Sequence, residues 1–346
     1  MKPLLVTMGD AAGIGPEIIV RAFRAGELAD AVVLGDPAVL RRAGSVMTAV
    51  ISTPEDLRAV PPGCLPVLVP PGLPAGLATL PLGQVHADNG DAAACCIEHA
   101  VRLVQAGQGA AIVTAPINKA ALAAAGVPYP GHTEMLQALA ATAGQGPPPV
   151  RMLLANDELR VVLVTIHLSL RRALDAVTFD AVLGTLRIAH RAAAAWGQVQ
   201  PRIAVAGLNP HASEGGLFGD EELTIIGPAV QAALAEGIDA SGPYAPDTVF
   251  MRARRGEFDL VVAMTHDHGL IPVKYLGVEQ GVNVTLGLPF VRTSPDHGTA
   301  FDIAGKGLAD PASLVAALRW ARRSLAASEA ESFSSVTEQR VKRRPI

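Results

Sequence analysis

The stretch DLVVAMTHDHGLIPVKYLGVEQGVNVTLGLPFVRTSPDHGTAFDIAGKG, residues 259–307, begins with an apolar run and continues at once into histidines, a lysine, an asparagine and an arginine. Residues 260–264 are apolar and of strand length, so they predict a buried strand, and the chain turns polar at His266. In open α/β sheets, ligand-binding residues lie just beyond the carboxyl ends of the strands. We therefore interpret this stretch as the wall of an active site.

The same order of residues occurs at two other places in the chain. Residues 160–165 form an apolar run that precedes His167, and residues 202–206 form another that precedes His211. In a parallel sheet the carboxyl ends of the strands share one edge, so these two histidines and His266 can converge there. Each histidine alone could simply satisfy the backbone of its loop, but the repeated pattern favours a metal site, because imidazole is a common ligand of zinc and its neighbours.

Composition places the chain among globular proteins that act on small molecules. It has 346 residues, half of them hydrophobic, and a net charge of −4, which allows two sizeable cores and shows no bias toward nucleic acid or membranes. The chain contains no apolar run as long as the roughly 18 residues of a membrane span, and it opens in a strand rather than a signal peptide, so we expect a cytoplasmic protein. Its three cysteines match neither a disulfide framework nor a zinc finger.

Three further motifs each allow two interpretations. The segment GDAAGIGPE, residues 9–17, is a glycine-rich turn from strand to helix that matches neither the dinucleotide nor the P-loop pattern, so it is either a tight turn or part of a cleft. Residues 118 and 119 could hold an anionic substrate or cap a helix. In GHTE, residues 131–134, Thr133 could be a helix N-cap, which would leave His132 without a role, or both side chains could donate hydrogen bonds to a ligand.

The longer motifs, taken together, carry a resemblance to a known family. They are GDAAGIGPE (9–17), GHTE (131–134), NPHASEGG (209–216), MTHDHGLIPVK (264–274) and GVNVTLGLPFVRTSPDHGTAFDIAG (281–305). In this order they resemble the 4-hydroxythreonine-4-phosphate dehydrogenase family of vitamin B6 synthesis, with the similarity running from about residue 4 to about residue 326. The segment DHGTAFDIAGKG also resembles the nucleotide-binding turn of isocitrate and isopropylmalate dehydrogenases.

The resemblance implies an α/β fold of the isocitrate/isopropylmalate dehydrogenase type, with two α/β/α domains and a cleft between them. A cofactor-binding domain is expected from both chain ends, residues 1–127 and 291–328, and a central domain, residues 128–290, is expected to carry the substrate, metal and dimer contacts. Residues 329–346 are polar and end in a basic cluster, which is typical of a solvated disordered tail rather than a nucleic-acid site.

The resemblance also implies a reaction and a set of residues. The expected activity is metal-dependent, NAD-linked oxidation of 4-phosphooxy-L-threonine at C3, followed by decarboxylation to 3-amino-2-oxopropyl phosphate. Zinc is the expected metal, with magnesium or cobalt as alternatives. The expected partner is a second copy of the chain, so that His167 and His211 of one subunit bind the metal together with His266 of the partner subunit.

The remaining roles are assigned residue by residue. The expected substrate ligands, all named from the matching motifs, are His132, Thr133, Lys274, Asn283 and Arg292. The expected catalytic residues are Lys274 and Asp247, and Asp247 could either orient a ligand histidine or take the proton of the substrate. The expected cofactor residues are His297, Gly298 and Asp302, where the carboxylate would bind ribose hydroxyls and disfavour NADP, unless it only caps the local turn.

Departures from the family pattern keep other functions open. The family usually has proline at the positions of Ala11 and Ser169, tyrosine at Thr265 and glutamine at His268. The last two lie in the expected substrate wall, so a paralogue that oxidises 4-phospho-threonate, 4-phospho-erythronate or a dihydrodiol carboxylate is the main alternative. A non-catalytic phosphometabolite binder is a further alternative, and it requires that the three histidines bind no metal.

Overall fold

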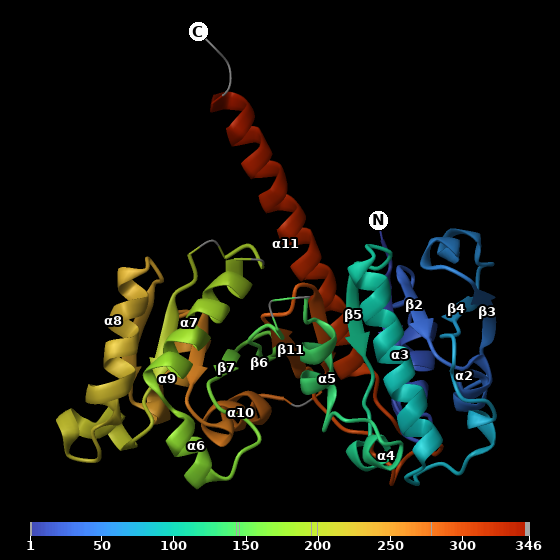
Figure 1. Ribbon diagram of the computed structural model, residues 1–346, viewed down its shortest axis with the longest axis horizontal. Coiled ribbons are helices and arrows are strands. Elements are labelled where there is room, and N and C mark those ends of the chain that lie inside the picture. The colour runs from blue at the N-terminus through green and yellow to red at the C-terminus, as the bar shows by residue number, and fades with distance from the viewer. Residues whose placement is uncertain are drawn as a thin grey trace. The chain divides into compact units, whose positions relative to one another are not determined.

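Figure 1 shows the computed structural model, which describes residues 2–342 apart from 143, 145, 195, 199 and 278, with side chains described as far as Ala327. The chain folds into two compact units, of which the first contains residues 1–150 and 288–321. The second unit contains residues 151–287 and the residues from 322 onward. The chain thus passes between units after Val150, Gly287 and Ala321, whereas the sequence analysis placed two crossings, near residues 127 and 290.

The first unit is built on a parallel sheet. In spatial order its strands are β3 (Met47–Ile51), β4 (Cys64–Leu68), β2 (Ala31–Leu34), β1 (Leu4–Thr7), β5 (Ala111–Thr114) and β12 (Val291–Pro295). Strands β1, β2 and β5 are entirely buried runs of apolar residues closed by threonine or leucine, which is the composition of strands covered on both faces.

Helices connect and cover these strands. They are α1 (Gly15–Arg24), α2 (Pro37–Ala43), η1 (Pro54–Ala59), η2 (Leu77–Thr79), α3 (Ala87–Gln105), α4 (Lys119–Ala124), α5 (His132–Leu139) and the start of α11 (Ala312–Lys342). Helix α3 packs over β1, β2 and β5, and it is visible in front of that part of the sheet in Figure 1. Its buried Cys96, Ile97 and Val101 join Leu5 and Ile112 of the sheet in one core.

The second unit has a mixed sheet. Its strands are, in spatial order, β11 (Val282–Leu286), β6 (Arg151–Ala155), β7 (Arg160–Leu163), β10 (Leu260–Ala263), β8 (Ile203–Ala206) and β9 (Ala240–Tyr244). Pairing is antiparallel from β11 to β7 and parallel from β7 to β9. The three strands predicted to carry histidines are therefore parallel neighbours, as the sequence analysis predicted.

The helical segments of the second unit position the loops at the strand ends. They are α6 (Leu170–Ala176), α7 (Phe179–Ala194), η3 (Pro210–Gly216), η4 (Glu222–Ile226), α8 (Gly227–Ala235), α9 (Pro246–Arg254) and α10 (His266–Tyr275). Helices α9 and α10 pack on β10, and their buried Val249, Leu270 and Val273 form a core with Val161 and Val261 of the sheet.

The last helix is longer than predicted. The apolar spacing predicted a helix over residues 312–326 and an irregular tail from 329, but the backbone of α11 continues to Lys342. Alanine, glutamate, glutamine, arginine and lysine are frequent in this segment and are good helix formers, so the backbone can remain helical where the apolar pattern ends. The final part of the expected tail, residues 343–346, lies outside the described residues. Among the described helices, none combines the length and apolarity needed to cross a membrane.

Candidate active site

The three strand-end histidines of the second unit occupy different local structures. His167 follows β7 and is exposed, His266 is the first residue of α10 and is half-buried, and His211 lies in η3 after β8 and is exposed. The ring centroids of His167 and His266 are 5.6 Å apart. Asp267 follows His266 and its Oδ1 lies 2.8 Å from the Nδ1 of that histidine, which orients the ring. The structure therefore brings two of the three predicted ligands together within one chain.

His211 is presented by a left-handed turn. His211, Ala212, Ser213 and Glu214 have φ values of 55°, 52°, 65° and 47°. Left-handed backbone costs a non-glycine residue about 1–2 kcal/mol, so four in succession store on the order of 4–8 kcal/mol. Since a whole domain is stable by only about 5–15 kcal/mol, contacts elsewhere must hold this turn in place. Residues kept in such conformations are concentrated at functional sites.

A buried carboxylate supplies contacts of this kind. Oε1 of Glu222 accepts hydrogen bonds from the backbone N–H of Leu208 at 2.6 Å and of Asn209 at 2.7 Å. Its Oε2 accepts from Nδ2 of Asn209 at 2.8 Å, and Glu221 accepts from the same amide at 2.6 Å. The loop that leads into η3 is thus fastened to the start of η4.

The donor chemistry of these histidines suits a borderline metal such as zinc, because neutral imidazole nitrogens are among its usual ligands. Within a single chain, however, no group of three or more His, Cys, Asp or Glu side chains is arranged to hold a metal ion in the part that the structure describes. The ring neighbour of His211 is Phe218, with centroids 6.2 Å apart.

The first unit contains a buried cationic site. Arg292 on β12 is 2% exposed, and its Nη2 donates to Oγ1 of Thr114, at the end of β5, over 2.6 Å. Burial lowers the pKa of Arg292 to about 9. His132 begins α5, and burial together with the positive charge of Arg292 lowers its pKa well below 6.5, so the imidazole is neutral. An anionic ligand beside these two residues would compensate the buried charge.

Two of the alternatives left open by the sequence are decided here. Gly131 rather than Thr133 is the N-cap of α5, and Thr133 is a half-buried residue of its first turn, so capping does not account for this threonine. In contrast, Asn118 is the N-cap of α4 and its side chain accepts from the N–H of Ala121 at 3.0 Å. The structure therefore gives Asn118 a capping role, and Lys119 beside it is exposed.

The other residues predicted in the second unit lie on three different elements. Lys274 is half-buried in the last turn of α10. Asn283 is half-buried on β11, and its buried Oδ1 accepts no hydrogen bond from a described residue. Asp247 is exposed in the first turn of α9. Buried polar atoms in proteins are normally hydrogen-bonded. Of these three residues, Asn283 therefore gives the indication of a ligand, through its unsatisfied side-chain amide oxygen.

The expected cofactor turn is docked on the glycine-rich loop of residues 9–17. The N–H of Ile14 donates to the carbonyl of Thr299 at 3.0 Å, and a carboxylate oxygen of Glu17 accepts from the N–H of Gly305. Gly305 has φ 78°, so its conformation favours glycine. At Gly298, a Cβ would meet no atom of the protein within 4 Å, so the space over the backbone there is open. Two motifs that are far apart in the sequence thus form one structure.

The other residues of the predicted turn lie at its surface. His297 is half-buried, and its Nδ1 lies 3.0 Å from the carbonyl oxygen of Gly298. Its Nε2 is buried and bonds to no described residue. Asp302 is exposed, so its carboxylate is accessible to a ligand.

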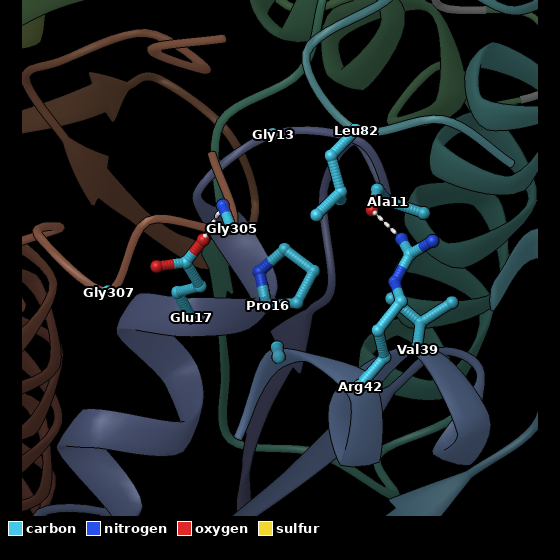
Figure 2. Close-up of a pocket in the computed structure, with 10 residues that line it drawn as sticks. Ala11, Gly13, Pro16, Glu17, Val39, Arg42, Leu82, Gly305 and Gly307 are labelled. Carbon is cyan, nitrogen blue, oxygen red and sulfur yellow. Dashed lines mark hydrogen bonds between the residues drawn. The ribbon is translucent and has the colours of Figure 1, made fainter. Parts of the chain in front are cut away.

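A cavity of about 130 Å³ lies where these two motifs meet (Figure 2). Arg42 lines it and donates to the carbonyl oxygens of Ala11 at 2.7 Å and of Ala78 and Leu80 at 2.8 Å, so its guanidinium braces the backbone. Burial lowers the pKa of Arg42. Glu17 also lines the cavity and is 5% exposed, and its Oε2 is buried without a hydrogen-bond partner among the described residues.

Sequence reasoning did not select four of these polar residues, namely Asp10, Glu17, Arg42 and Glu222. Asp10 is 1% exposed and its Oδ1 accepts from the N–H of Ala12 at 2.8 Å, while burial raises its pKa to about 6. Asp10 and Glu17 belong to the loop quoted in the sequence analysis, which was a usable signal. Arg42 and Glu222 lie in helical segments where a charged residue ordinarily faces solvent, so their sequence context carried no such signal.

The fold and the polar groups gathered at its strand ends are those of an α/β enzyme. The profile of one family, described as pyridoxal phosphate biosynthetic protein PdxA, matches residues 27–321. This chain belongs to that family.

Its relatives carry two different activity names. A protein of Beijerinckia indica named 4-hydroxythreonine-4-phosphate dehydrogenase is 55% identical over 323 residues, which are 93% of this chain and 94% of the relative. A protein of Pectobacterium atrosepticum named D-threonate 4-phosphate dehydrogenase is 47% identical and covers 92% of this chain and 98% of its own length. The crystal structure of 4-hydroxythreonine-4-phosphate dehydrogenase from Klebsiella pneumoniae is 44% identical, with a TM-score of 0.84 over 94% of this chain and 100% of that chain.

Proposed function

We propose that the protein is an NAD-linked, divalent-metal-dependent dehydrogenase that oxidises 4-phosphooxy-L-threonine at C3, with decarboxylation to 3-amino-2-oxopropyl phosphate. The observation that carries this proposal is the buried Arg292 guanidinium beside the neutral imidazole of His132, in a chain that is 55% identical to a relative with this activity name. A buried cation next to hydrogen-bond donors suits a substrate with phosphate and carboxylate groups.

Each proposed role follows from the chemistry of its side chain. Arg292, with its planar fork, and His132, Thr133, Lys274 and Asn283 are proposed to bind the oxygens and the amino group of the substrate. Neutral His132 can donate from one ring nitrogen and accept at the other. Lys274 and Asp247 are the proposed proton-transfer groups, and Asp247 is accessible on the first turn of α9.

His167, His211 and His266 are the proposed metal ligands, with zinc as the proposed ion and magnesium or cobalt as alternatives. When bound, the metal would lower the pKa of the substrate hydroxyl and stabilise the developing ketone oxygen. The exposure of His167 and His211 supports a site that is completed by a second subunit, because one chain supplies no three-ligand group within its described residues.

Exposed apolar side chains on the histidine-bearing segments support a homodimer. They are Leu168, Leu170, Leu174, Leu217, Phe218, Leu223, Ile271 and Tyr275. Leu168 follows His167 directly, and Ile271 and Tyr275 share α10 with His266. Large exposed apolar groups gathered on the same segments as functional residues are typical of an interaction surface. We propose that this surface is the dimer contact, as the resemblance implied.

The turn from His297 to Gly305 is proposed to bind NAD, which would accept the hydride. Asp302 is exposed and can accept from ribose hydroxyls, and the open space over Gly298 allows close approach of a ligand to the backbone. In this arrangement the domain made from the two chain ends binds the cofactor, and the central domain carries the metal ligands.

A second substrate is favoured by one feature of the proposed wall. Thr265 is 4% exposed, and the buried Nδ1 of His268 has no hydrogen-bond partner among the described residues. An unsatisfied imidazole nitrogen can bind a substrate hydroxyl in place of an amine. D-threonate 4-phosphate, named for a relative that is 47% identical, is therefore the alternative substrate.

An assay of NADH formation tests the proposal directly. The full chain would be supplied with NAD and Zn²⁺, Mg²⁺ or Co²⁺ and with 4-phosphooxy-L-threonine, D-threonate 4-phosphate or D-erythronate 4-phosphate. We expect kcat/KM to be highest for the first. A higher value for D-threonate 4-phosphate would support the alternative, and absence of NADH with all three would favour a binding protein.

The variant Arg292→Ala tests the proposed anion site. Loss of a charge-assisted hydrogen bond costs about 1.5–3 kcal/mol, so KM for the phosphorylated substrate should rise by at least about tenfold while KM for NAD changes little. Arg292→Lys keeps the charge but loses the fork and should recover part of the effect. Arg187→Ala, which removes an exposed ion pair with Glu236, is the control. An equal rise in both KM values for the alanine variant would make Arg292 a structural residue.

A further inference from the structure

The turn that presents His211 cannot maintain its own conformation. Four successive non-glycine residues from His211 to Glu214 have left-handed φ values, and within the described part of the chain the exposed imidazole of His211 has one ring contact, with Phe218 at 6.2 Å. A strained turn remains in place only when the surrounding structure determines it. The groups that fasten its two ends therefore decide where the imidazole lies.

Glu222 fastens the end of the loop that leads from β8. It is 2% exposed, and its two oxygens accept three hydrogen bonds, from the backbone N–H groups of Leu208 and Asn209 and from Nδ2 of Asn209. Gly207 allows this approach, since a Cβ there would lie 3.0 Å from Oε1 of Glu222 and 3.0 Å from the Cα of Ala212. Gly207 is thus packed closely against both the carboxylate of Glu222 and the left-handed turn at Ala212.

Its surroundings distinguish Glu222 from a metal ligand. All three hydrogen bonds come from the protein, and the side chain is buried, whereas His211 is exposed. Glu222 also opens η4, a π-helical segment, and such segments occur frequently at functional sites. Glu221, its neighbour, is half-buried and bonds only to Nδ2 of Asn209 among the groups of this loop.

We infer that Glu222 is a positioning residue that acts through the backbone of Leu208 and Asn209 to hold His211 in its metal-binding orientation. This inference rests on the proposed metal role of His211. Groups outside the ligand shell of a metal typically change its affinity by about 10–100-fold. Glu222 belongs to this class although it contacts the loop and not the ring.

The test measures Co²⁺ affinity of the full-length protein by the absorption of the bound ion, which reports ligand geometry without any need for turnover. Glu222→Ala and Glu222→Asp, which keeps the charge but is one methylene shorter, should each bind Co²⁺ at least about tenfold more weakly than the parent. Glu236→Ala is the control, because it removes an exposed carboxylate of the second unit that pairs with Arg187 and does not bond to this loop, and its affinity should stay within about threefold. Wild-type affinity in Glu222→Asp would overturn the inference, and this variant decides the question if Glu222→Ala does not fold.

Hydrogen exchange separates this inference from the proposed function. In both Glu222 variants the amides of Leu208 and Asn209 should exchange faster than in the parent, with amides of β10 unchanged, and unchanged exchange would overturn the anchoring role. If His211→Ala binds Co²⁺ as tightly as the parent, the metal role of His211 fails. The exchange rates then still establish whether Glu222 anchors the loop.

Discussion

At the scale of single residues, burial decides which charged groups have changed properties. Asp10 and Arg292 are both almost fully buried, and burial favours the neutral form of each side chain. Burial therefore raises the pKa of Asp10 to about 6 and lowers the pKa of Arg292 to about 9. Glu222 is buried to a similar degree, but it accepts three hydrogen bonds that replace lost contacts with water. The proposed site thus contains charges that a ligand can compensate and one charge that the fold already satisfies.

Asp10 gives a prediction for the pH dependence of stability. Its pKa is raised in the folded state, so the stability that it contributes is fully present below pH 3.8 and is lost as the pH rises through about 6. At pH 8 the ionised group therefore lowers the free energy of unfolding by about 3 kcal/mol. Asp10→Asn keeps an acceptor for the N–H of Ala12 and removes the charge, so we expect it to be more stable than the parent at pH 8.

Urea unfolding at pH 8 and pH 4 measures this effect. The difference in the free energy of unfolding between Asp10→Asn and the parent should be large at pH 8 and small at pH 4. Asp91→Asn, at an exposed position of α3, is the control and should show no such change with pH. An equal difference at both pH values for Asp10→Asn would show that burial does not penalise this carboxylate.

At the scale of elements, the site is made by loops that distant segments hold in place. The left-handed turn of η3 is fastened through Glu222, and the turn from His297 to Gly305 is docked on the loop of residues 9–17. In both cases a glutamate side chain accepts from backbone N–H groups of the other segment. Rigid placement of such loops is what allows exposed side chains on them to meet a ligand in one orientation.

Asp302 tests the role of the second turn. If its exposed carboxylate binds ribose hydroxyls, Asp302→Ala should bind NAD about tenfold more weakly and should discriminate less between NAD and NADP. Equilibrium titration with both cofactors measures the two affinities. Asp91→Ala, at an exposed position of α3, is the control. An unchanged NAD affinity together with an unchanged ratio between the cofactors would remove the ribose assignment.

At the scale of the whole molecule, the proposed homodimer rests on the arrangement of exposed apolar surface. Several exposed apolar residues of the second unit lie on or next to the segments that carry the histidines, and His167 and His211 are themselves exposed. A second subunit that covers this surface would remove apolar area from water, at about 25 cal/mol for each Å² buried. In the proposed dimer it would also supply the third metal ligand.

Charge introduced into this surface should separate the subunits. Burying an unpaired carboxylate in a subunit contact is costly, so we expect the double variant Leu170→Glu with Ile271→Glu to sediment as a monomer. Without the ligand from the partner subunit, this variant should also retain less metal. The control is Met47→Glu, at a residue 65% exposed on β3 of the first unit, and it should sediment like the parent. A double variant that sediments like the parent and retains its metal would place the subunit contact elsewhere.

Local sequence patterns were sufficient for the apolar strands that precede the histidines and for the edge at which the histidines emerge. An apolar run such as residues 260–263 is buried in an α/β sheet, so the strand could be predicted from it, and His266 lies shortly beyond its carboxyl end. The long helix α11 was predicted only as far as residue 326, where its helical spacing of apolar residues ends. That spacing indicates which residues pack against the core, and it does not report the helix propensity of the residues that follow.

The sequence by itself determined the apolar strands that precede the histidines, because these depend on the order of apolar and polar residues along the chain, and its resemblance to a known family gave the class of fold. Only the tertiary structure decided that Asn118 caps a helix, that Arg42 braces Ala11, and that Glu222 anchors the loop before His211. The physical reason is that a hydrogen bond depends on which donor and acceptor meet in space. Glu222 and Leu208 are 14 residues apart, and their meeting is settled by the packing of the segments that carry them.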